Sequence, residues 1–233
     1  MPTVDVNPAN FAFQIITVDG AIFQIVDDQL CVLLIQRGFE PFLHEWALPG
    51  VYIPREESSL QALERALVQK TGTSLKQIEL IDQPFAFDAP GRDPRGQVIT
   101  IVHTGLCRAV RPGDHPSATM LQNPKFVPVQ GLPKLAYDHN SIIAFAHHRL
   151  QLLAGNTNAL AALLPKTFTL SELQHTYEAI FCKPLDKRNF RKKILSLDLL
   201  EEVAAKTKTG PHRPAQLYQF RTRAFENTAQ SFA

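Results

Sequence analysis

Two arginines near the middle of the chain have an evident chemistry. Arg92 and Arg95 stand on either side of Asp93-Pro94, a pair that favours a turn, so both guanidinium groups can point toward one concave spot. A guanidinium binds phosphate through two parallel hydrogen bonds, and a diphosphate has enough oxygens for two such groups. The spacing therefore predicts a diphosphate-binding loop. The alternative is a solvated hairpin loop whose arginines pair with Asp88 and Asp93.

A second group of residues shares one face of a helix that we predict over residues 58–71. Ala66, Gln69 and Lys70 are spaced i, i+3 and i+4, which places them on the same side. This face carries a positive charge and lacks the anionic oxygens that Mg²⁺ or Mn²⁺ prefers. Lys70 can instead contact a ligand phosphate directly, or it can form a salt bridge with Glu57.

Aromatic and charged residues elsewhere in the same region are candidates for contact with a nucleotide. Trp46, the only tryptophan, can stack on a nucleoside together with Phe87, or it can pack in the core. Arg37 can reach a phosphate or pair with Glu45. Glu56 can accept hydrogen bonds from ribose hydroxyls or remain a solvated turn carboxylate. The residues that we predict to bind the ligand are Arg37, Trp46, Glu56, Arg65, Lys70, Phe87, Arg92 and Arg95.

A basic helix is predicted to begin after Asp186, which can cap its amino terminus. On that helix Phe190 and Ile194 face inward, whereas the basic side chains and Asn189 point outward. Arg and Asn can read guanine and adenine edges, while Lys and Arg neutralise phosphates, so the helix suits DNA binding. The alternative is a solvated helix face. The predicted DNA-binding residues are Lys183, Lys187, Arg188, Asn189, Arg191, Lys192, Lys208, His212 and Arg213.

The elements that position these residues form two groups. In the first part of the chain, alternating and β-branched stretches predict a sheet with a helix at 58–71 and another at 139–153. Asp27-Asp28 marks a hairpin turn between the first two strands. This pattern is typical of an α+β layered domain. Strands are expected at residues 13–26, 29–36, 78–80, 85–87 and 98–106.

The last part of the chain has a different pattern. Thr169 to Glu172 is a capping box that opens a helix through Phe181, followed by a turn and the basic helix. Strands at 199–206 and 215–221 flank a polar loop. Helix, turn, basic helix and basic hairpin together predict a winged helix-turn-helix. We therefore expect two domains, one over residues 1–153 and one over residues 154–233.

Charge is distributed unevenly between these two parts. Residues 1–165 contain 12 Lys+Arg and 15 Asp+Glu, whereas residues 166–233 contain 12 Lys+Arg and 7 Asp+Glu. The positive excess in the second part predicts a unit that binds a polyanion. The three cysteines are far apart and lack metal-ligand spacing, which favours reduced thiols. No segment resembles a signal peptide or a membrane span, so a cytoplasmic protein without a membrane partner is expected.

The stretch from Trp46 to Gly72 resembles a Nudix box, the motif that holds a divalent cation in nucleoside diphosphate hydrolases. Counting back from Gly72 places Arg65 at the motif arginine and Glu57 at its first glutamate. A rival register that starts at Gly50 fits less well and also lacks the paired glutamates. The resemblance implies a nucleotide pocket without catalytic or metal-binding residues. The positions where the motif has its other glutamates hold Ala66, Gln69 and Lys70.

Taken over nearly its whole length, the chain resembles the Nudix-related transcriptional regulators of NAD metabolism, the NrtR family. The resemblance implies an α+β fold, a Nudix-like α/β/α sandwich, with a carboxy-terminal winged helix-turn-helix domain. It also implies a homodimeric repressor of NAD-biosynthesis genes that binds double-stranded operator DNA and releases it when ADP-ribose or a related nucleotide binds. ADP-ribose is then an effector, and no cofactor is expected. The matching motifs are Trp46–Gly50, the box to Gly72, the Gly91–Gly96 loop, Tyr137-Asp138-His139 and the basic winged helix.

Two other functions remain open from the sequence. The chain can be a hydrolase of ADP-ribose-like nucleoside diphosphate sugars with an unusual metal site built from Glu56, Glu57 and Glu64. Release of AMP from ADP-ribose would indicate that activity. The chain can also be a nucleotide-binding protein whose basic tail contacts RNA or another protein. In that case its affinity for a defined DNA duplex would be no higher than its affinity for any other polyanion.

Overall fold

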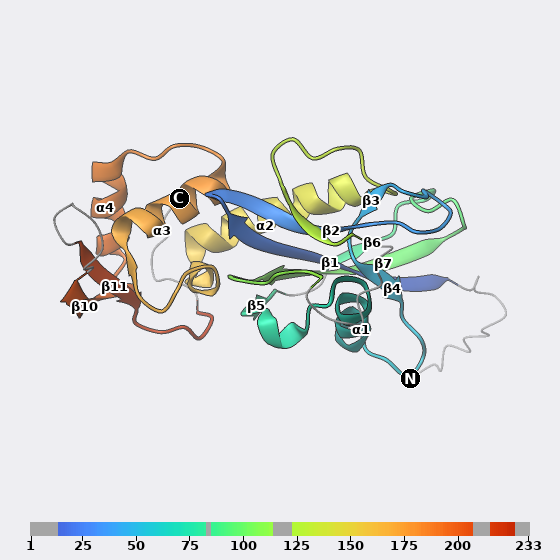
Figure 1. The fold of residues 1–233 in the computed structure, drawn as a ribbon, viewed down its shortest axis with the longest axis horizontal. Coiled ribbons are helices and arrows are strands. Elements are labelled where there is room, and N and C mark those ends of the chain that lie inside the picture. Colours follow the sequence, from blue (N-terminus) through green and yellow to red (C-terminus); the bar gives the residue numbers. More distant parts are fainter. Residues whose placement is uncertain (1–13, 83–84, 114–122, 207–214, 227–233) are drawn as a thin grey trace, which may run out of the picture.

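A mixed sheet with a helix on each face forms the first part of the protein (Figure 1). The computed structural model describes residues 14–82, 85–113, 123–206 and 215–226. Within these residues eight strands form one sheet, in which the order β3-β2-β1-β7-β5 is extended by β4 on β1, β6 on β7 and β8 on β2. The strands are β1 (Ile15–Val26), β2 (Gln29–Gln36), β3 (Trp46–Ala47), β4 (Gly50–Tyr52), β5 (Leu80–Ile81), β6 (Phe85–Phe87), β7 (Val98–Leu106) and β8 (Lys125–Pro128).

The central strand β1 is buried on both faces because its side chains alternate between two helices. Val18 and Ile22 pack with Leu63 and other residues of helix α1 (Ser59–Thr71). Phe23, on the opposite face, belongs to the cluster that contains Ile142 of helix α2 (His139–Asn156). Each fully buried aliphatic side chain of this kind stabilises the fold by roughly 1.5–3 kcal/mol. This two-sided burial produces the α/β/α layering.

Helix α1 begins and ends where local sequence signals place its ends. The Ser58 hydroxyl accepts the backbone N–H of Gln61, and the Gln61 side chain accepts the N–H of Ser58, so the capping box is complete. Gly72 closes the helix with φ 71°, a left-handed conformation that favours glycine. The ends of the helix are therefore fixed, and with them the direction in which each of its side chains points.

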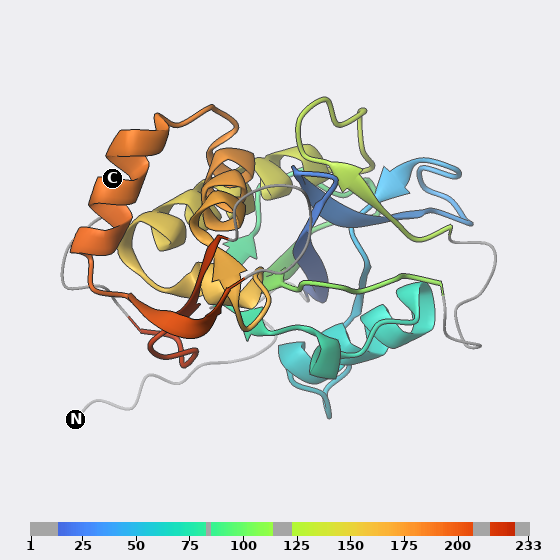
Figure 2. The same cartoon turned by 60° about the vertical axis from the view of Figure 1, so that its left-hand side comes forward.

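The second part of the protein is a small helical unit with a three-stranded sheet (Figure 2). Helix α4 lies at the outer end of the molecule, beyond α3. In the part of the chain that the structure describes, the sheet order is β10-β11-β9. The elements are η4 (Ala159–Ala162), β9 (Phe168–Thr169), α3 (Leu170–Phe181), α4 (Lys187–Ser196), β10 (Leu200–Lys206) and β11 (Gln216–Phe220).

One continuous hydrophobic core joins the two parts. It includes Phe23 of β1, Leu150 of α2, Tyr177 of α3 and Phe190 of α4. Helix α2 runs from the eight-stranded sheet toward the helical unit and packs against α3 (Figure 1). The helical unit is therefore held against the sheet domain by buried contacts as well as by the covalent linker.

Most of the predicted elements are confirmed to within a few residues. The turn between the first two strands is made by Asp27 and Asp28, which both have positive φ, as a tight hairpin turn requires. The strand expected at 78–80 lies at 80–81, after a 3-10 turn. The helix expected at 139–153 continues to Asn156, so it passes through the domain boundary that we predict near residue 153. The sequence did not predict β3, β4, β8 or β9. Among the described residues, none of the helices combines the length and the hydrophobicity that a membrane span requires.

Candidate functional site

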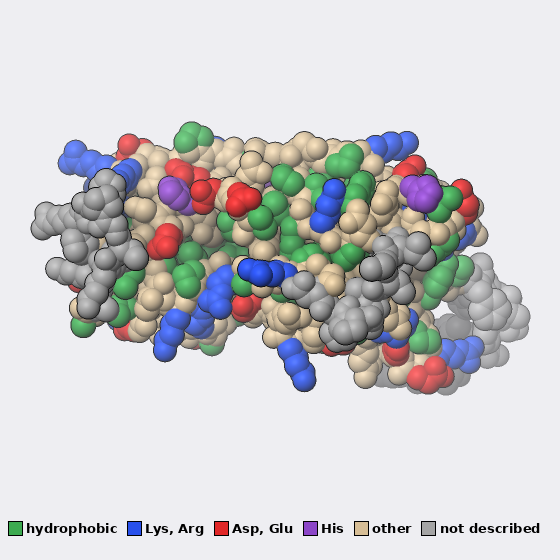
Figure 3. Space-filling view, in the orientation of Figure 1, with side chains coloured by type: hydrophobic (Ala, Val, Ile, Leu, Met, Phe, Trp, Pro, Cys, Tyr) green, Lys and Arg blue, Asp and Glu red, His purple; other side chains and the backbone are tan. Residues whose placement is uncertain are grey.

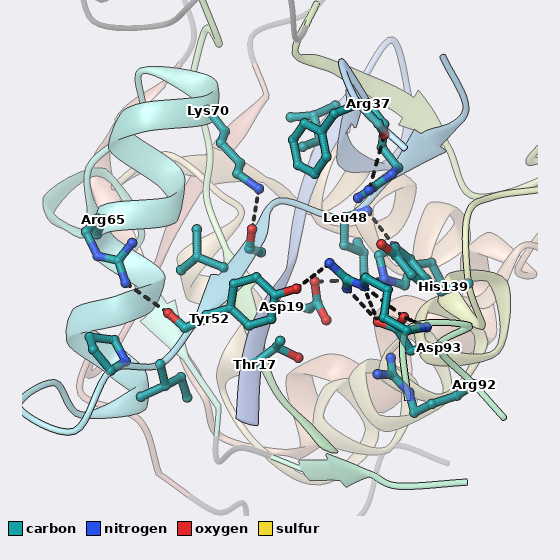
Figure 4. Close-up of a pocket in the computed structure, with 18 of the residues that line it drawn as sticks. Thr17, Asp19, Arg37, Leu48, Tyr52, Arg65, Lys70, Arg92, Asp93 and His139 are labelled. Atoms are coloured by element: carbon teal, nitrogen blue, oxygen red, sulfur yellow. Dashed lines mark hydrogen bonds and ion pairs between the residues drawn. The ribbon is translucent and has the colours of Figure 1, made fainter. Parts of the chain in front are cut away.

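A cavity of about 590 Å³ opens between the sheet, α1 and the start of α2 (Figure 4). Its walls come from six separate segments of the chain, which converge because β1 is central and both helices pack on it. Polar and charged groups of these segments face one another across the hollow. The polar and aromatic lining residues include Thr17, Asp19, Arg37, Phe39, Tyr52, Glu57, Arg65, Lys70, Arg92, Asp93, Arg95, Tyr137 and His139.

The α1 side of the cavity is organised by a pair between Arg65 and Glu57. The guanidinium donates to both carboxylate oxygens at 2.8–3.1 Å and to the Tyr52 carbonyl at 2.9 Å. Hydrogen bonding from Arg65 lowers the pKa of the Glu57 carboxyl. This pair joins the loop before α1 to the helix itself, and it fits the register in which these two residues occupy the motif arginine and first glutamate.

Lys70 projects from α1 into the cavity, where its ammonium donates to the carbonyl of Gly50 (Figure 4). Burial lowers the pKa of Lys70 to about 8, although Asp19 acts in the opposite direction. Three of the cavity arginines add to this lowering. The salt bridge to Glu57 considered above is not formed, because Arg65 already occupies that carboxylate. Gly50 itself leaves no room for a side chain, since a Cβ there would collide with Asp19.

The two arginines of the Asp-Pro loop are held by different carboxylates. Arg92 donates to both oxygens of Asp138 at 2.7 and 3.0 Å, and its side chain is only 4% exposed. Arg95 pairs with the buried Asp93 and also donates to the Tyr52 hydroxyl. Burial tends to raise the pKa of Asp93, but the hydrogen bonds from Arg95 outweigh it, so the pKa is lowered. Both arginines therefore line the cavity, and Arg95 pairs with Asp93 as the alternative interpretation expects, whereas Arg92 pairs with Asp138 and not with Asp88.

Arg37 enters the cavity from the end of β2. Its guanidinium donates to the carbonyls of Pro41 at 2.8 Å and Phe39 at 3.4 Å. It also lies over the rings of Phe39 and Tyr137, at 4.7 and 4.9 Å from their centroids. The alternative pairing with the Glu45 side chain is not seen, and Arg37 is buried without a carboxylate partner among the described residues.

The segment that leads into α2 contacts three walls of the cavity with three consecutive residues. The ring of Tyr137 lies beside two arginines, Arg37 and Arg95. Asp138 holds the Asp-Pro loop through Arg92, as described. The Nδ1 atom of His139 accepts the backbone N–H of Leu48 at 2.9 Å. Burial lowers the pKa of His139, which favours the neutral ring.

Tyr137 has two further features that mark it as unusual. Its φ is 56°, a left-handed conformation that is costly for a bulky residue and is usually found where function requires it. Its hydroxyl is buried and has no hydrogen-bond partner among the described residues. Tyr137 and His139 appear in the quoted motif before α2, but their contacts with the cavity were not predicted, nor were those of Asp19 and Tyr52.

Three of the predicted ligand-binding residues do not line the cavity. Trp46 packs against the core, with the Lys125 ammonium 4.1 Å from its ring centroid. Phe87 packs edge-on against Phe145 of α2 at 5.6 Å. Glu56 is exposed in the turn before α1. Their positions do not support contact with a ligand in this cavity, whereas Arg37, Arg65, Lys70, Arg92 and Arg95 all line it.

A divalent cation does not fit the residues at the positions where the motif has glutamates. Ala66 is fully buried and has no ligand atom, Gln69 is exposed, and Lys70 brings a positive charge. Among the described residues there is no group of three or more His, Cys, Asp or Glu side chains that could hold a metal ion.

Helix α4 presents a basic surface at the opposite end of the molecule. The side chain of Asp186 accepts the N–H of Asn189 at 2.8 Å and caps the helix, as predicted. Phe190 and Ile194 are buried, so the helix faces the core in the expected orientation. Lys and Arg side chains project from this end of the protein (Figure 3). The exposed members of the predicted DNA-binding set are Lys183, Lys187, Arg188, Asn189 and Lys192.

The remaining members of that set differ from the expectation or lie elsewhere. Arg191 is half-buried, and its Nε is buried without a hydrogen-bond partner among the described residues, so it does not simply point outward. It follows Phe190 on α4 and lies close enough to Tyr218 to affect its pKa. Lys208, His212 and Arg213 lie outside the described residues.

Comparison with known proteins gives two family matches that divide the chain as its fold does. Residues 17–145 match the NUDIX domain, and residues 160–220 match the NrtR DNA-binding winged helix domain. The chain is 32% identical over 221 residues to the ADPR responsive transcriptional repressor NtrR of Acinetobacter baylyi, covering 91% of this chain and 84% of that protein.

Solved structures show the same similarity in three dimensions. The crystal structure of Shewanella oneidensis NrtR complexed with a 27mer DNA matches with a TM-score of 0.72 and 33% identity, over 93% of this chain and 98% of that one. The cocrystal structure of the NUDIX domain of the same protein with ADP ribose matches with a TM-score of 0.53 and 34% identity, over 63% of this chain and 94% of that one.

Proposed function

We propose that this chain, which belongs to the NrtR family of Nudix-related regulators, is a transcriptional repressor that binds operator DNA and releases it when ADP-ribose or a related NAD-derived nucleotide binds. The observation that carries this proposal is the position of α2. One end of this helix touches the walls of the cavity, and its other half holds the DNA-binding unit. Ligand and DNA can therefore influence each other through one element.

The cavity suits a diphosphate ligand. Of the described residues, five cationic and three acidic side chains line it, which leaves an excess of positive charge. Such a pocket favours an anion, and the cations are already held in place before the ligand arrives. The exposed aromatic rings of Phe39 and Tyr52 also line it and offer surface to a base. The similar Shewanella domain was crystallised with ADP ribose, which supports this choice of ligand.

Helix α4 suits the major groove of DNA. Its buried side anchors it to the core, while Lys187, Arg188, Asn189 and Lys192 are exposed. Arg and Asn side chains can read base edges, and lysines can neutralise phosphates. A palindromic operator would be read by two such helices about one DNA turn apart, so we expect a two-fold homodimer. The chain would act in the cytoplasm on NAD-biosynthesis genes and needs no cofactor.

Helix α2 provides a physical path between ligand and DNA. It has 18 residues and is therefore about 27 Å long. Toward its far end, His147 and Gln151 contact the Ile180 carbonyl of α3 at 2.6 and 3.1 Å, and the Tyr177 hydroxyl donates to Ala154 at 3.3 Å. A nucleotide that favours one position of α2 would weaken DNA binding by its differential affinity and by no more than that.

We further propose that the chain is not an enzyme. In the proposed register the helix face that should carry glutamates carries Ala66, Gln69 and Lys70 instead. The carboxylates of the cavity are engaged in other contacts: Asp19 with Thr100, Glu57 with Arg65 and Asp93 with Arg95. The alternative, hydrolysis through Glu56, Glu57 and Glu64, has little support, because Glu64 accepts hydrogen bonds from Ser74 and the N–H of Leu75.

A gel-shift assay with the full chain tests the proposed function. DNA from upstream of NAD-biosynthesis genes should be retarded, a shuffled duplex should not, and ADP-ribose should release the specific complex. Incubation of the same preparation with ADP-ribose and Mg²⁺ should yield no AMP. Steady production of AMP, or a complex that ADP-ribose leaves intact, would contradict the proposal.

A further inference from the structure

We propose that Lys70 takes the place of the divalent cation in this cavity, so that the protein binds the diphosphate of its ligand directly and without metal. The inference rests on the proposed function, since it takes a nucleoside diphosphate such as ADP-ribose as the ligand. It names the cationic side chain that binds the diphosphate. It also defines the form in which the ligand is recognised, which is free of Mg²⁺.

The first argument is the mismatch between the cavity and a metal. The three helix positions provide one methyl group, one exposed amide and one ammonium group. A hard divalent cation needs several anionic or carbonyl oxygens, and a lysine ammonium nearby repels it. The Gly50 carbonyl, a backbone oxygen on this side of the cavity, already accepts a hydrogen bond from Lys70. The lysine thus places a positive charge in this part of the cavity and engages one of its backbone oxygens.

The second argument is the state of the other cations. Arg65, Arg92 and Arg95 each form an ion pair with a carboxylate. Arg37 has two carbonyls and two aromatic rings around it. Lys70 has one carbonyl and forms no ion pair within the described chain. Because an ammonium has three donors, two remain for ligand oxygens.

The third argument is energetic. Burial disfavours the charged form of Lys70, and the surrounding arginines disfavour it further, so its pKa is lowered to about 8. A bound diphosphate reverses this by placing negative charge beside the ammonium. The cavity is therefore arranged so that an anion relieves an existing electrostatic imbalance. A ligand that arrives with its phosphates already coordinated by Mg²⁺ relieves it less, which selects for metal-free diphosphates.

Calorimetric titration of ADP-ribose into the full chain tests this inference. Wild-type protein should bind at least as tightly in EDTA as in excess Mg²⁺, because the metal-free diphosphate is the form that the cavity prefers. Lys70→Met keeps the length of the side chain but removes the charge, and it should weaken binding by about 10- to 100-fold, the range expected for a charge-assisted contact. Lys70→Arg keeps the charge and should retain most of the affinity. Gln69→Met, at the neighbouring exposed position outside the cavity lining, is the matched control and should bind like wild type.

The outcomes separate this inference from the function on which it rests. Wild-type affinity in Lys70→Met, a requirement for Mg²⁺ in the wild type, or an equal loss in Lys70→Arg and Lys70→Met would overturn the role of Lys70 while leaving a nucleotide sensor in place. Absence of any ADP-ribose binding by the wild type would overturn both. Thermal denaturation of each variant checks that it is folded, and removal of a buried charge is expected to leave stability equal or higher.

Discussion

The two ends of this molecule use positive charge in opposite ways. In the cavity, most arginines are fixed by carboxylates, as Arg92 is by Asp138 and Arg95 is by Asp93. On α4, Lys187, Arg188 and Lys192 are exposed and form no ion pair within the described chain. A small ligand needs cations in fixed positions, because ordering them at the moment of binding is costly. A DNA backbone needs cations that neutralise its phosphates and displace the counterions condensed on it, and the fixed position of each side chain matters less.

The largest expected effect follows from removing the exposed charges. The triple variant Lys187→Ala, Arg188→Ala, Lys192→Ala should lower DNA affinity by at least about 100-fold and flatten its salt dependence. ADP-ribose affinity should not change, because these residues lie on α4, at the opposite end of the molecule from the cavity. Fluorescence anisotropy with labelled operator and calorimetry with ADP-ribose measure the two quantities. An equal loss of both affinities would contradict the separation of the two regions.

A smaller effect is expected from a variant that weakens the coupling between ligand binding and DNA binding but leaves both sites intact. Asp138→Asn weakens the hold of Arg92 on the start of α2 but keeps the size of the side chain. DNA affinity without ligand should stay near wild type, while the reduction of that affinity by ADP-ribose should shrink by about tenfold, within the usual range of coupling energies. Asp88→Asn is the control. Asp88 is exposed, lies in the loop that carries Arg92 and has no side-chain contact in the described structure. Unchanged release in Asp138→Asn would show that coupling follows another route.

The pH dependence of ligand binding sharpens the comparison further. The pKa of Lys70 is lowered to about 8 in the free protein, and a diphosphate favours the charged form. ADP-ribose affinity should therefore be highest below pH 8, where Lys70 is protonated. Above pH 8 it should fall by up to about tenfold per pH unit. Lys70→Arg should give a flat profile, because arginine stays protonated. A flat wild-type profile between pH 7 and 10 would contradict the role of Lys70. The charged groups that face it are Asp19, Arg37, Arg65 and Arg95.

The smallest expected effects are changes in stability, which test whether the two regions unfold together through their common hydrophobic core. Ser58→Ala in the sensor and Thr169→Ala in the winged unit each remove a helix cap and should cost about 1 kcal/mol of stability. Since one core runs through both parts, each variant should lower a single unfolding transition. Trp46, the only tryptophan, reports on the sensor, so urea denaturation followed by its fluorescence should also detect Thr169→Ala. A tryptophan transition that Thr169→Ala leaves unchanged would show that the parts unfold independently.

Local signals in the sequence predicted local structure well. Ser58, Gly72 and Asp186 lie at helix ends in the roles that their side chains or backbone freedom suggested. These predictions succeed because a cap depends on residues within one turn of the chain.

The site was harder to predict because its contacts join distant segments. Arg92 and Asp138 are 46 residues apart, and Leu48 and His139 are 91 apart. Nothing near Arg92 in the sequence distinguishes a partner on α2 from one in its own loop. Trp46 has the right chemistry for a base, but its position on a short edge strand turns it toward Lys125 and the core.

Reciprocal titration measures the central claim most directly. The affinity of the full chain for operator DNA is determined with and without saturating ADP-ribose, and the affinity for ADP-ribose with and without saturating DNA, all in EDTA. Linkage requires that both affinities fall by the same factor if one conformational equilibrium connects the sites. We expect equal factors of at least about tenfold, within the usual range for coupled sites. An unchanged DNA affinity in the presence of bound ADP-ribose would contradict the account.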